Sequence, residues 1–227
     1  KYRKDFLGNV SHEMKTPIFN LQGYVLTLLD GGMDDPQINK LYLERTERSI
    51  NRLISIVDDL ESISRLESGE FKLHIEKFNI IKLVEDIFEA QDMQQKKYGI
   101  KLGFDSNYSK PIWVNADRRR ITEVLGNLIG NSIKYGKKNG KTTVSFVDTG
   151  DSILVDVSDN GIGIAEEDLP RIFERFYRVD KSRSRDSGGT GLGLSIVKHI
   201  IQAHNQTINV RSKPGKGTSF IFSLEKA

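Results

Sequence analysis

Apolar residues recur every seven positions over two long stretches of this 227-residue sequence, and this periodicity limits the fold more than any other feature. A seven-residue repeat keeps an apolar stripe along one side of a helix and favours packing against other helices. Between the stretches, Gly31 and Gly32 are typical of a helix end, and Asp35-Pro36 is typical of a helix start. The repeats consist of Leu7, Met14, Leu21 and Leu28 in the first stretch and of Leu43, Ile50 and Val57 in the second.

We therefore predict an antiparallel helical hairpin over residues 1–68. Two helices bury only one face of each other, so a homodimer that forms a four-helix bundle is the expected completion. A hairpin that packs only against the rest of its own chain stays open as the alternative.

Residues 69–227 are predicted to form a second domain. After Ser68-Gly69 the period changes, and strands and helices then alternate, which suggests a mixed sheet with helices on one face, an α/β sandwich. The chain as a whole is thus assigned to the α+β class. The predicted helices lie near 80–95, 117–135 and 191–203, and the predicted strands start with Phe71, Leu73 and Ile75 and continue near 100–104, 144–146, 153–157, 208–210 and 220–224.

Charge and composition exclude several classes of function. The 34 basic and 31 acidic residues leave a net charge of +3, which is too small to indicate nucleic acid or a membrane surface as a partner. The absence of cysteine excludes disulfides and thiolate metal sites and fits the cytosol. No apolar run approaches the ~20 residues that span a bilayer. Because the chain starts at Lys1 inside a helical pattern, we interpret it as part of a longer protein whose sensor or membrane segment would lie upstream.

His12 is the first candidate for chemistry. In the heptad of the first stretch it falls away from the apolar stripe, so we expect it to be exposed. An exposed imidazole is a competent nucleophile at neutral pH, and Glu13 can hold the other ring nitrogen and accept its proton. Thr16 lies on the same face, and Pro17 removes one helical hydrogen bond. An ordinary surface histidine is the alternative; metal binding fits poorly because no second ligand follows at helical spacing.

Two asparagines in the predicted helix near 117–135 are a second candidate. Asn127 and Asn131 lie four residues apart on one face of an otherwise apolar helix, and Lys134 and Tyr135 continue that face. Amide oxygens suit Mg²⁺, which shares its ligands with waters and nucleotide phosphates. A merely solvated helix face is the alternative.

Three glycine-rich segments follow. Asp159 stands at the end of a predicted strand, where a carboxylate can accept the exocyclic amine of adenine, although a plain Asn-Gly turn is also possible. Residues 188–194 open a helix, and the free N–H groups of a helix N-terminus favour phosphate. Residues 215–219 form a turn before the last strand. Between Asp159 and residues 188–194, the polar stretch 180–187 suggests a lid whose cations reach phosphate. The acidic residues interleaved in this stretch argue against RNA binding.

Taken together, these segments resemble the sequence boxes of bacterial sensor histidine kinases. The flanks of His12 resemble the H-box of that family, and the other boxes occur in family order over nearly the whole chain. The resemblance implies a dimerisation and phosphotransfer hairpin over 1–68 and a catalytic domain of the Bergerat ATP-binding type over 69–227. The matching segments are 127–135 for the N-box, 159–163 for G1, 173–176 for the F-box, 188–194 for G2 and 215–218 for G3.

The resemblance also implies the reaction. It implies ATP-dependent autophosphorylation of His12, with Glu13 as acid/base and Arg178 steadying the transferred phosphoryl group, and then transfer to an aspartate of a separate response regulator. Thr16 matches the position that orients water for dephosphorylation of the regulator, and Asn131 would ligate Mg²⁺ with help from Asn127. The implied nucleotide contacts are Asn127, Asn131, Lys134, Tyr135, Asp159, Gly161, Gly163, Lys181, Gly189, Thr190, Gly191, Leu192, Gly193 and Thr218.

Departures from the family pattern are small. Lys15 stands where arginine is common, and Asn205 stands where glycine is common, at a helix end that asparagine tolerates. Two other functions compete: a different ATPase of the same nucleotide-binding class, against which the hairpin with His12 argues, and a scaffold without catalysis, against which the intact boxes argue. The expected setting is the cytoplasmic portion of a membrane-bound bacterial sensor.

Overall fold

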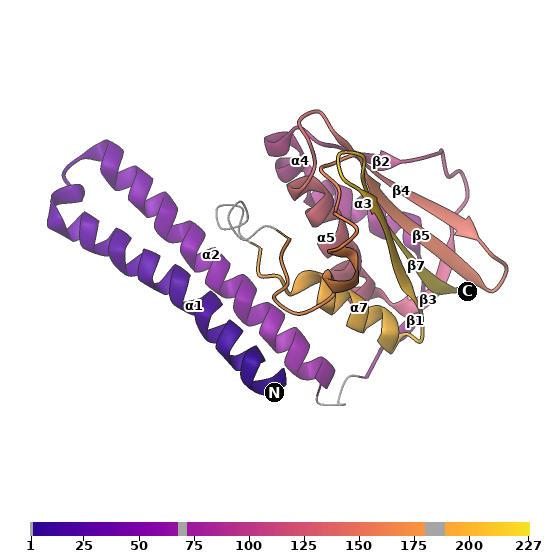
Figure 1. Cartoon of the computed structure of the whole chain (residues 1–227). Helices are drawn as coiled ribbons and strands as arrows, with labels where there is room; N and C mark the ends of the chain where they lie inside the picture. The colour runs from indigo at the N-terminus through magenta and orange to yellow at the C-terminus, as the bar shows by residue number, and fades with distance from the viewer. Residues whose placement is uncertain (1, 68–71, 180–188) are drawn as a thin grey trace.

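The computed structural model describes residues 2–67, 72–179 and 189–227. A long helical hairpin lies beside an α/β domain (Figure 1). Helix α1 (Tyr2–Thr27) and helix α2 (Pro36–Glu67) form the hairpin, and a π-helical segment (Leu28–Gly32) begins the turn between them. The predicted antiparallel hairpin is confirmed, and α1 stays helical beyond Pro17.

The hairpin turn uses the residues that the sequence marked for it. Gly31 has a φ of +93°, and a Cβ added to Gly32 would lie 2.6 Å from the Thr27 carbonyl oxygen, so larger residues would strain the turn. The Asp35 carboxylate then caps α2 by accepting hydrogen bonds from the backbone N–H of Gln37 (2.9 Å) and Ile38 (3.3 Å).

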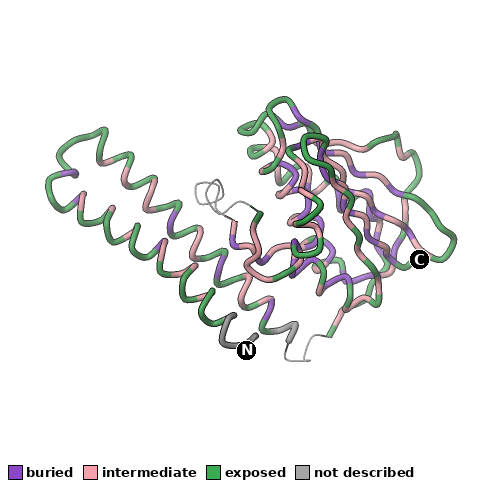
Figure 2. Tube along the Cα trace, viewed as in Figure 1, coloured by how far each residue is buried: buried purple, intermediate pink, exposed green. Residues whose placement is uncertain are grey.

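The apolar repeat of α2 does not face α1 in this chain. Tyr42 packs edge-on against Tyr24 of α1, with 5.6 Å between ring centroids. The predicted stripe instead stays open: Leu43, Ile50 and Val57 are 54%, 43% and 50% exposed. Much of the hairpin away from the α/β domain is exposed (Figure 2). A second set of residues on α2, less exposed than this stripe, also recurs every seven positions: Tyr42, Ser49, Ile56 and Ile63.

The α/β domain is a seven-stranded mixed sheet with helices on one face, as predicted (Figure 1). Its strand order is β1-β3-β7-β5-β4-β2, with β6 also paired to β7, and only β2 and β4 run parallel. The strands are β1 (Ile75–Asn79), β2 (Lys101–Phe104), β3 (Trp113–Asp117), β4 (Lys141–Asp148), β5 (Ser152–Asp159), β6 (Ile208–Lys213) and β7 (Gly217–Lys226). The helices are α3 (Ile80–Ala90), α4 (Asp92–Tyr98), α5 (Arg118–Lys134), the 3-10 turn η2 (Leu169–Arg171) and α7 (Gly193–Ala203).

Three details differ from the sequence prediction. Strand β1 begins at Ile75, later than expected, and Phe71 lies outside the described residues. Strand β3 was not predicted; it pairs with both β1 and β7. The helix predicted over 80–95 is two helices, because the chain leaves helical geometry at Gln91 (φ −92°, ψ 4°).

The core lies between the sheet and helices α3, α5 and α7, and the hairpin takes part in it. Leu125 and Ile129 of α5 are fully buried against the sheet, and their polar neighbours on the opposite face of the helix are not. Ile63 of α2 is 1% exposed and belongs to the same apolar cluster. Helix α2 also contacts α7, so the end of the hairpin is packed onto the α/β domain. Among the described helices, none has an apolar stretch long enough to cross a membrane.

Candidate functional site

His12 is exposed on α1, as its heptad position predicted. The hydroxyl of Thr16 donates to the His12 carbonyl oxygen (3.4 Å), a hydrogen bond that threonine commonly forms one turn back within a helix. The Glu13 carboxylate, next to His12, points across the hairpin: its Oε2 lies 2.8 Å from Arg52 Nη2 and 3.9 Å from Arg178 Nη1. Two of the predicted catalytic residues, Glu13 and Arg178, therefore meet where the hairpin faces the α/β domain.

The asparagine face of α5 looks toward the start of α7. Asn127 donates from Nδ2 to the Glu123 carbonyl oxygen (3.0 Å), and its Oδ1 faces Gly193, where an added Cβ would lie only 2.5 Å away. Asn131 follows one turn later and is half-buried. The two amide oxygens are neutral donors of the kind that Mg²⁺ accepts beside phosphates.

Lys134 and Tyr135 end α5 next to the glycine-rich segment. The Lys134 ammonium lies 5.1 Å from the centroid of the Tyr135 ring, and a Cβ on Gly189 would lie 2.5 Å from Lys134 Nζ. Burial, with further contributions from the positive charges of Arg178 and Arg52, lowers the pKa of Lys134 to about 8. Burial raises the pKa of the Tyr135 hydroxyl. This corner of the site holds excess positive charge at neutral pH.

Asp159 closes the other end of the site. Its Oδ1 accepts hydrogen bonds from the backbone N–H of Gly161 (2.7 Å) and Thr218 (3.3 Å), and its burial raises the pKa of the carboxyl group. The chain is tightly packed here: a Cβ on Gly163 would lie 2.1 Å from the Lys213 carbonyl oxygen. Residues 159–163 and the turn before β7 therefore form one unit around Asp159, as the sequence boxes suggested.

The segment before α7 joins several of the predicted residues. The Gly191 carbonyl oxygen accepts from the Phe176 N–H (2.9 Å), which links the segment to the residues that lead to Arg178. Thr190 is buried, and its Oγ1 accepts from the Leu192 N–H (3.2 Å). The Leu192 side chain is fully buried in the core, so only its backbone can contact a ligand. Lys181 lies outside the described residues.

Helix α2 contributes residues that the sequence did not single out. Thr190 Oγ1 donates to Asp59 Oδ2 (2.5 Å), and Ser62 Oγ donates to Glu123 Oε1 (3.1 Å). Burial, the largest effect, raises the pKa of Asp59 to about 6. One feature of the sequence could have indicated these α2 residues: Arg52 and Asp59 lie seven residues apart on one side of α2, between the apolar positions.

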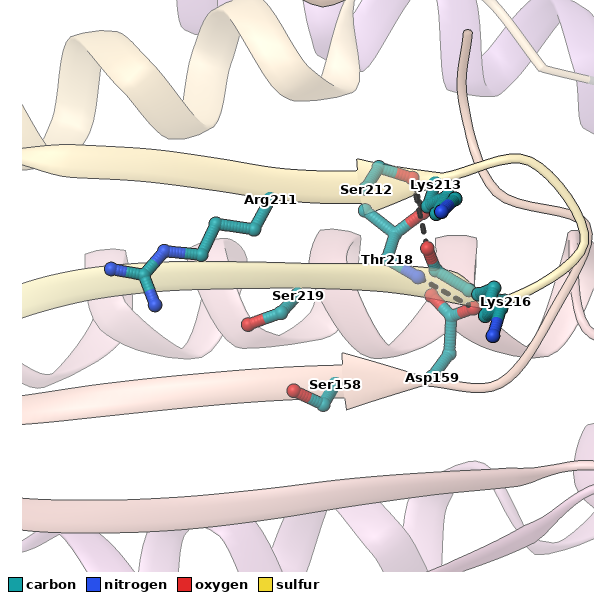
Figure 3. Close-up of a pocket in the computed structure, with 9 residues that line it drawn as sticks. Ser158, Asp159, Arg211, Ser212, Lys213, Lys216, Thr218 and Ser219 are labelled. Carbon is teal, nitrogen blue, oxygen red and sulfur yellow. Dashed lines mark hydrogen bonds between the residues drawn. The ribbon is translucent and has the colours of Figure 1, made fainter. Parts of the chain in front are cut away.

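A pocket of about 350 Å³ opens on the face of the sheet that the helices leave uncovered (Figure 3). Asp159 and Thr218 lie at one end of the pocket, and Ser158, Arg211 and Ser219 line it from the strands beside them. The asparagines of α5, Lys134 and Thr190 lie on the other, helix-covered side. The pocket therefore shares only its edge with the candidate site.

On the helix-covered side, the arrangement has the parts needed for phosphoryl transfer. A carboxylate is held by backbone N–H groups at one end, amide oxygens and an ammonium group lie in the middle, and an arginine reaches the carboxylate beside an exposed histidine at the other end. Positioning and electrostatic stabilisation of this kind account for most of the catalysis in phosphoryl transfer.

Comparison with known proteins identifies the family of the chain. The family described as "His Kinase A (phospho-acceptor) domain" matches residues 2–69, and the family described as "Histidine kinase-, DNA gyrase B-, and HSP90-like ATPase" matches residues 116–227. The sensor histidine kinase WalK of Bacillus subtilis is 36% identical over 225 residues, which are 98% of this chain and 36% of WalK. The chain thus spans about a third of the length of this relative.

Two solved structures resemble almost the whole chain. The histidine kinase ThkA, in complex with the response regulator protein TrrA, aligns with a TM-score of 0.78 at 28% identity and covers 98% of this chain and 61% of that one. Full-length ShkA in complex with AMPPNP aligns with a TM-score of 0.70 at 25% identity and covers 98% of this chain and 46% of that one.

Proposed function

This chain belongs to the bacterial sensor histidine kinases, and from that premise we propose that it binds ATP in its α/β domain and transfers the γ-phosphoryl group to His12. The observation that carries the proposal is the approach of Arg178 to Glu13, the residue next to the exposed His12. Through this contact the nucleotide-binding side of the α/β domain reaches the phosphoacceptor turn of the hairpin. The division into a phosphotransfer hairpin (1–68) and a catalytic domain (69–227) belongs to the same proposal.

We derive the transfer step from the residues at this contact. His12 Nε2 attacks the γ-phosphorus, a nitrogen–phosphorus bond forms, and the bond from phosphorus to the bridging oxygen breaks with its electron pair going to ADP. The proton on Nδ1 passes to the Glu13 carboxylate, which prevents a positive charge from building up on the ring. Arg178 lies where it can balance the charge of the transferring group.

ATP would lie along the helix-covered end of β5. Asp159 would accept the exocyclic amine of adenine, and Gly161, Gly163 and Thr218 would shape the base pocket around it. The backbone of 189–193 would face the phosphates, with Lys134 and Tyr135 beside it. Mg²⁺ held by Asn131 and Asn127 would neutralise part of the triphosphate charge; the neutral oxygen donors of these side chains fit that ion.

The proposed partners follow from the family. TrrA, in its complex with ThkA, is a response regulator, and we propose that a receiver aspartate of such a protein takes the phosphoryl group from His12. Thr16, one turn from His12, would serve the reverse hydrolysis of the phosphorylated regulator. A homodimer through the hairpin and a place in the cytoplasmic portion of a longer membrane-bound sensor stay predictions.

The test is incubation with γ-labelled ATP and Mg²⁺, comparing the chain with its His12→Gln variant. We expect label that is stable in base and labile in acid, as a phosphorus–nitrogen bond is, and we expect the variant to lose it. Label that survives in His12→Gln would identify another acceptor. A folded, ATP-binding wild type that takes up no label would contradict the proposal.

A further inference from the structure

Arg52 is the α2 residue most directly connected to the proposed chemistry. Its Nη2 lies 2.8 Å from Glu13 Oε2, and the two side chains are only 14% and 22% exposed. The contact joins residues 39 positions apart in the sequence, one on each helix of the hairpin. It is therefore a tertiary contact in a partly dehydrated place, where an ion pair has more orienting effect than at an open surface.

We propose that Arg52 is a positioning residue for Glu13, which it orients for proton transfer from His12. This inference rests on the proposed function and deepens it. Within the described residues, Glu13 forms two ion pairs through Oε2, one with Arg52 and a longer one with Arg178 at 3.9 Å. Oε1 is then the oxygen that can turn toward the ring of the neighbouring His12.

The surroundings of Arg52 support a role in the reaction. Lys134, at the end of α5, feels the charges of both Arg178 and Arg52, so Arg52 lies close to the phosphate side of the α/β domain as well as to the hairpin. Arg52 and Arg178 thus meet the Glu13 carboxylate beside His12, and the Lys134 ammonium lies near enough to feel both guanidinium charges. The excess positive charge of these groups suits an incoming triphosphate. The guanidinium is always charged and planar, so it can hold the Glu13 carboxylate in one orientation until this group accepts the proton.

The test is a kinetic comparison of Arg52→Ala with the wild type over a range of ATP concentrations. We expect kcat for autophosphorylation to fall roughly tenfold to hundredfold, because a well-placed acid/base group contributes about 10²–10⁴-fold and loses part of this when poorly oriented. We expect KM for ATP to change less than about twofold, because the nucleotide contacts lie in the α/β domain. Arg52→Lys keeps one charged donor and should restore part of the rate.

A double-mutant cycle separates positioning from a merely structural role. In a Glu13→Gln background, Arg52→Ala should lower the residual rate by less than about twofold, since its effect acts through Glu13. Arg48→Ala is the matched control, because Arg48 lies one turn earlier on α2, where its Nε donates to the Glu44 carbonyl oxygen (3.2 Å). It should label at the wild-type rate. If Arg52→Ala is unfolded by circular dichroism, Arg52→Gln takes its place in the cycle.

Each outcome bears on one proposal. Wild-type kcat in Arg52→Ala, a full further loss in the Glu13→Gln background, or a raised KM with unchanged kcat would overturn the positioning role. Absence of label in the folded wild type would overturn the proposed function instead, before any variant is compared.

Discussion

Gly217 is the tightest backbone position in the candidate site. Its φ is +110°, and an added Cβ would lie 1.9 Å from the Asp159 carbonyl oxygen. Gly215, two residues earlier, also has a positive φ, of +74°, but an added Cβ there would meet nothing within 4 Å. Comparing substitutions at Gly217 and Gly215 therefore distinguishes a steric clash from backbone strain at the adenine end of the site.

We expect Gly217→Ala to destabilise the chain by roughly 3–5 kcal/mol and to weaken ATP binding, because the clash must displace Asp159. Gly215→Ala should cost only about 1–2 kcal/mol, the strain of a left-handed alanine, and should leave ATP binding unchanged. Urea unfolding and nucleotide titration measure the two effects. Equal free energies of unfolding for the two variants would contradict the steric explanation.

Lys134 gives the site a pH dependence. Because burial lowers its pKa to about 8, the ammonium group loses its proton as the pH rises through that value, while bound phosphates favour the charged form. We therefore expect the affinity for ATP to fall up to roughly tenfold between about pH 7 and pH 9, with proton uptake on binding. Calorimetry in buffers of different ionisation enthalpy measures this. Lys134→Met should bind more weakly without that proton uptake; an unchanged uptake would implicate another group.

At the same scale, the sequence predicted His12 better than it predicted the partners of His12. Its heptad position was enough to predict an exposed side chain. Arg52 and Asp59 were not predicted, because their importance arises from residues 39 and 131 positions away. Charged residues on a long helix are usually solvated, and only the packing of α2 against α1 and α7 makes these two half-buried.

Between elements, the bond from Thr190 to Asp59 ties the segment before α7 to α2. The pKa of Asp59, raised to about 6 mainly by burial, belongs to the docked arrangement, where the charge of Glu123 on α5 also raises it. An undocked Asp59 would return toward its ordinary value of 3.8. The contribution of Asp59 to docking is therefore fully present below its ordinary pKa of 3.8 and is lost as the pH rises through about 6.

We expect the docked population to grow when the pH is lowered from about 7.5 to 5.5. The chain has no cysteine, so dyes can be placed at Asn20→Cys on α1 and Lys110→Cys on the α/β domain, both exposed positions, and energy transfer between them measures docking. Asp59→Asn should remove the pH dependence, whereas Asp58→Asn at the exposed neighbouring position should keep it. A response that persists in Asp59→Asn would show that other groups govern the docking.

The elements themselves were largely predictable, and the failures have physical reasons. Strand β3 was missed because one of its two inward residues is the small Ala116, so the alternation of apolar residues is weak. The break at Gln91 was missed because no glycine or proline marks it and the chain is helical again from Asp92 to Tyr98. The repeat did not reveal which side of α2 faces α1, because two stripes with the same seven-residue spacing run along this helix and a single sequence does not distinguish them.

For the whole molecule, the open stripe on α2 is the main indication of assembly. Leu43, Ile50 and Val57 are each at least 43% exposed on a helix that already packs against α1 with another side. We expect a dimer in sedimentation velocity, and we expect the double substitution Ile50→Glu and Val57→Glu to give a monomer, since buried unpaired carboxylates are costly. Met93→Glu, at an 84% exposed apolar residue of α4, should leave the dimer intact. A wild-type monomer would favour the alternative in which the hairpin packs only on its own chain.

Thr190 also links the molecule to its nucleotide through thermodynamic reciprocity. It lies in the segment proposed to face the phosphates, and it also donates to Asp59 on α2. If nucleotide binding and the docking of α2 compete for this hydroxyl group, each must weaken the other by the same factor. A stimulus that moves α2 would then change the affinity for ATP, and the ATP concentration would change the work needed to move α2. The response of such a protein would depend on the energy state of the cell as well as on its stimulus.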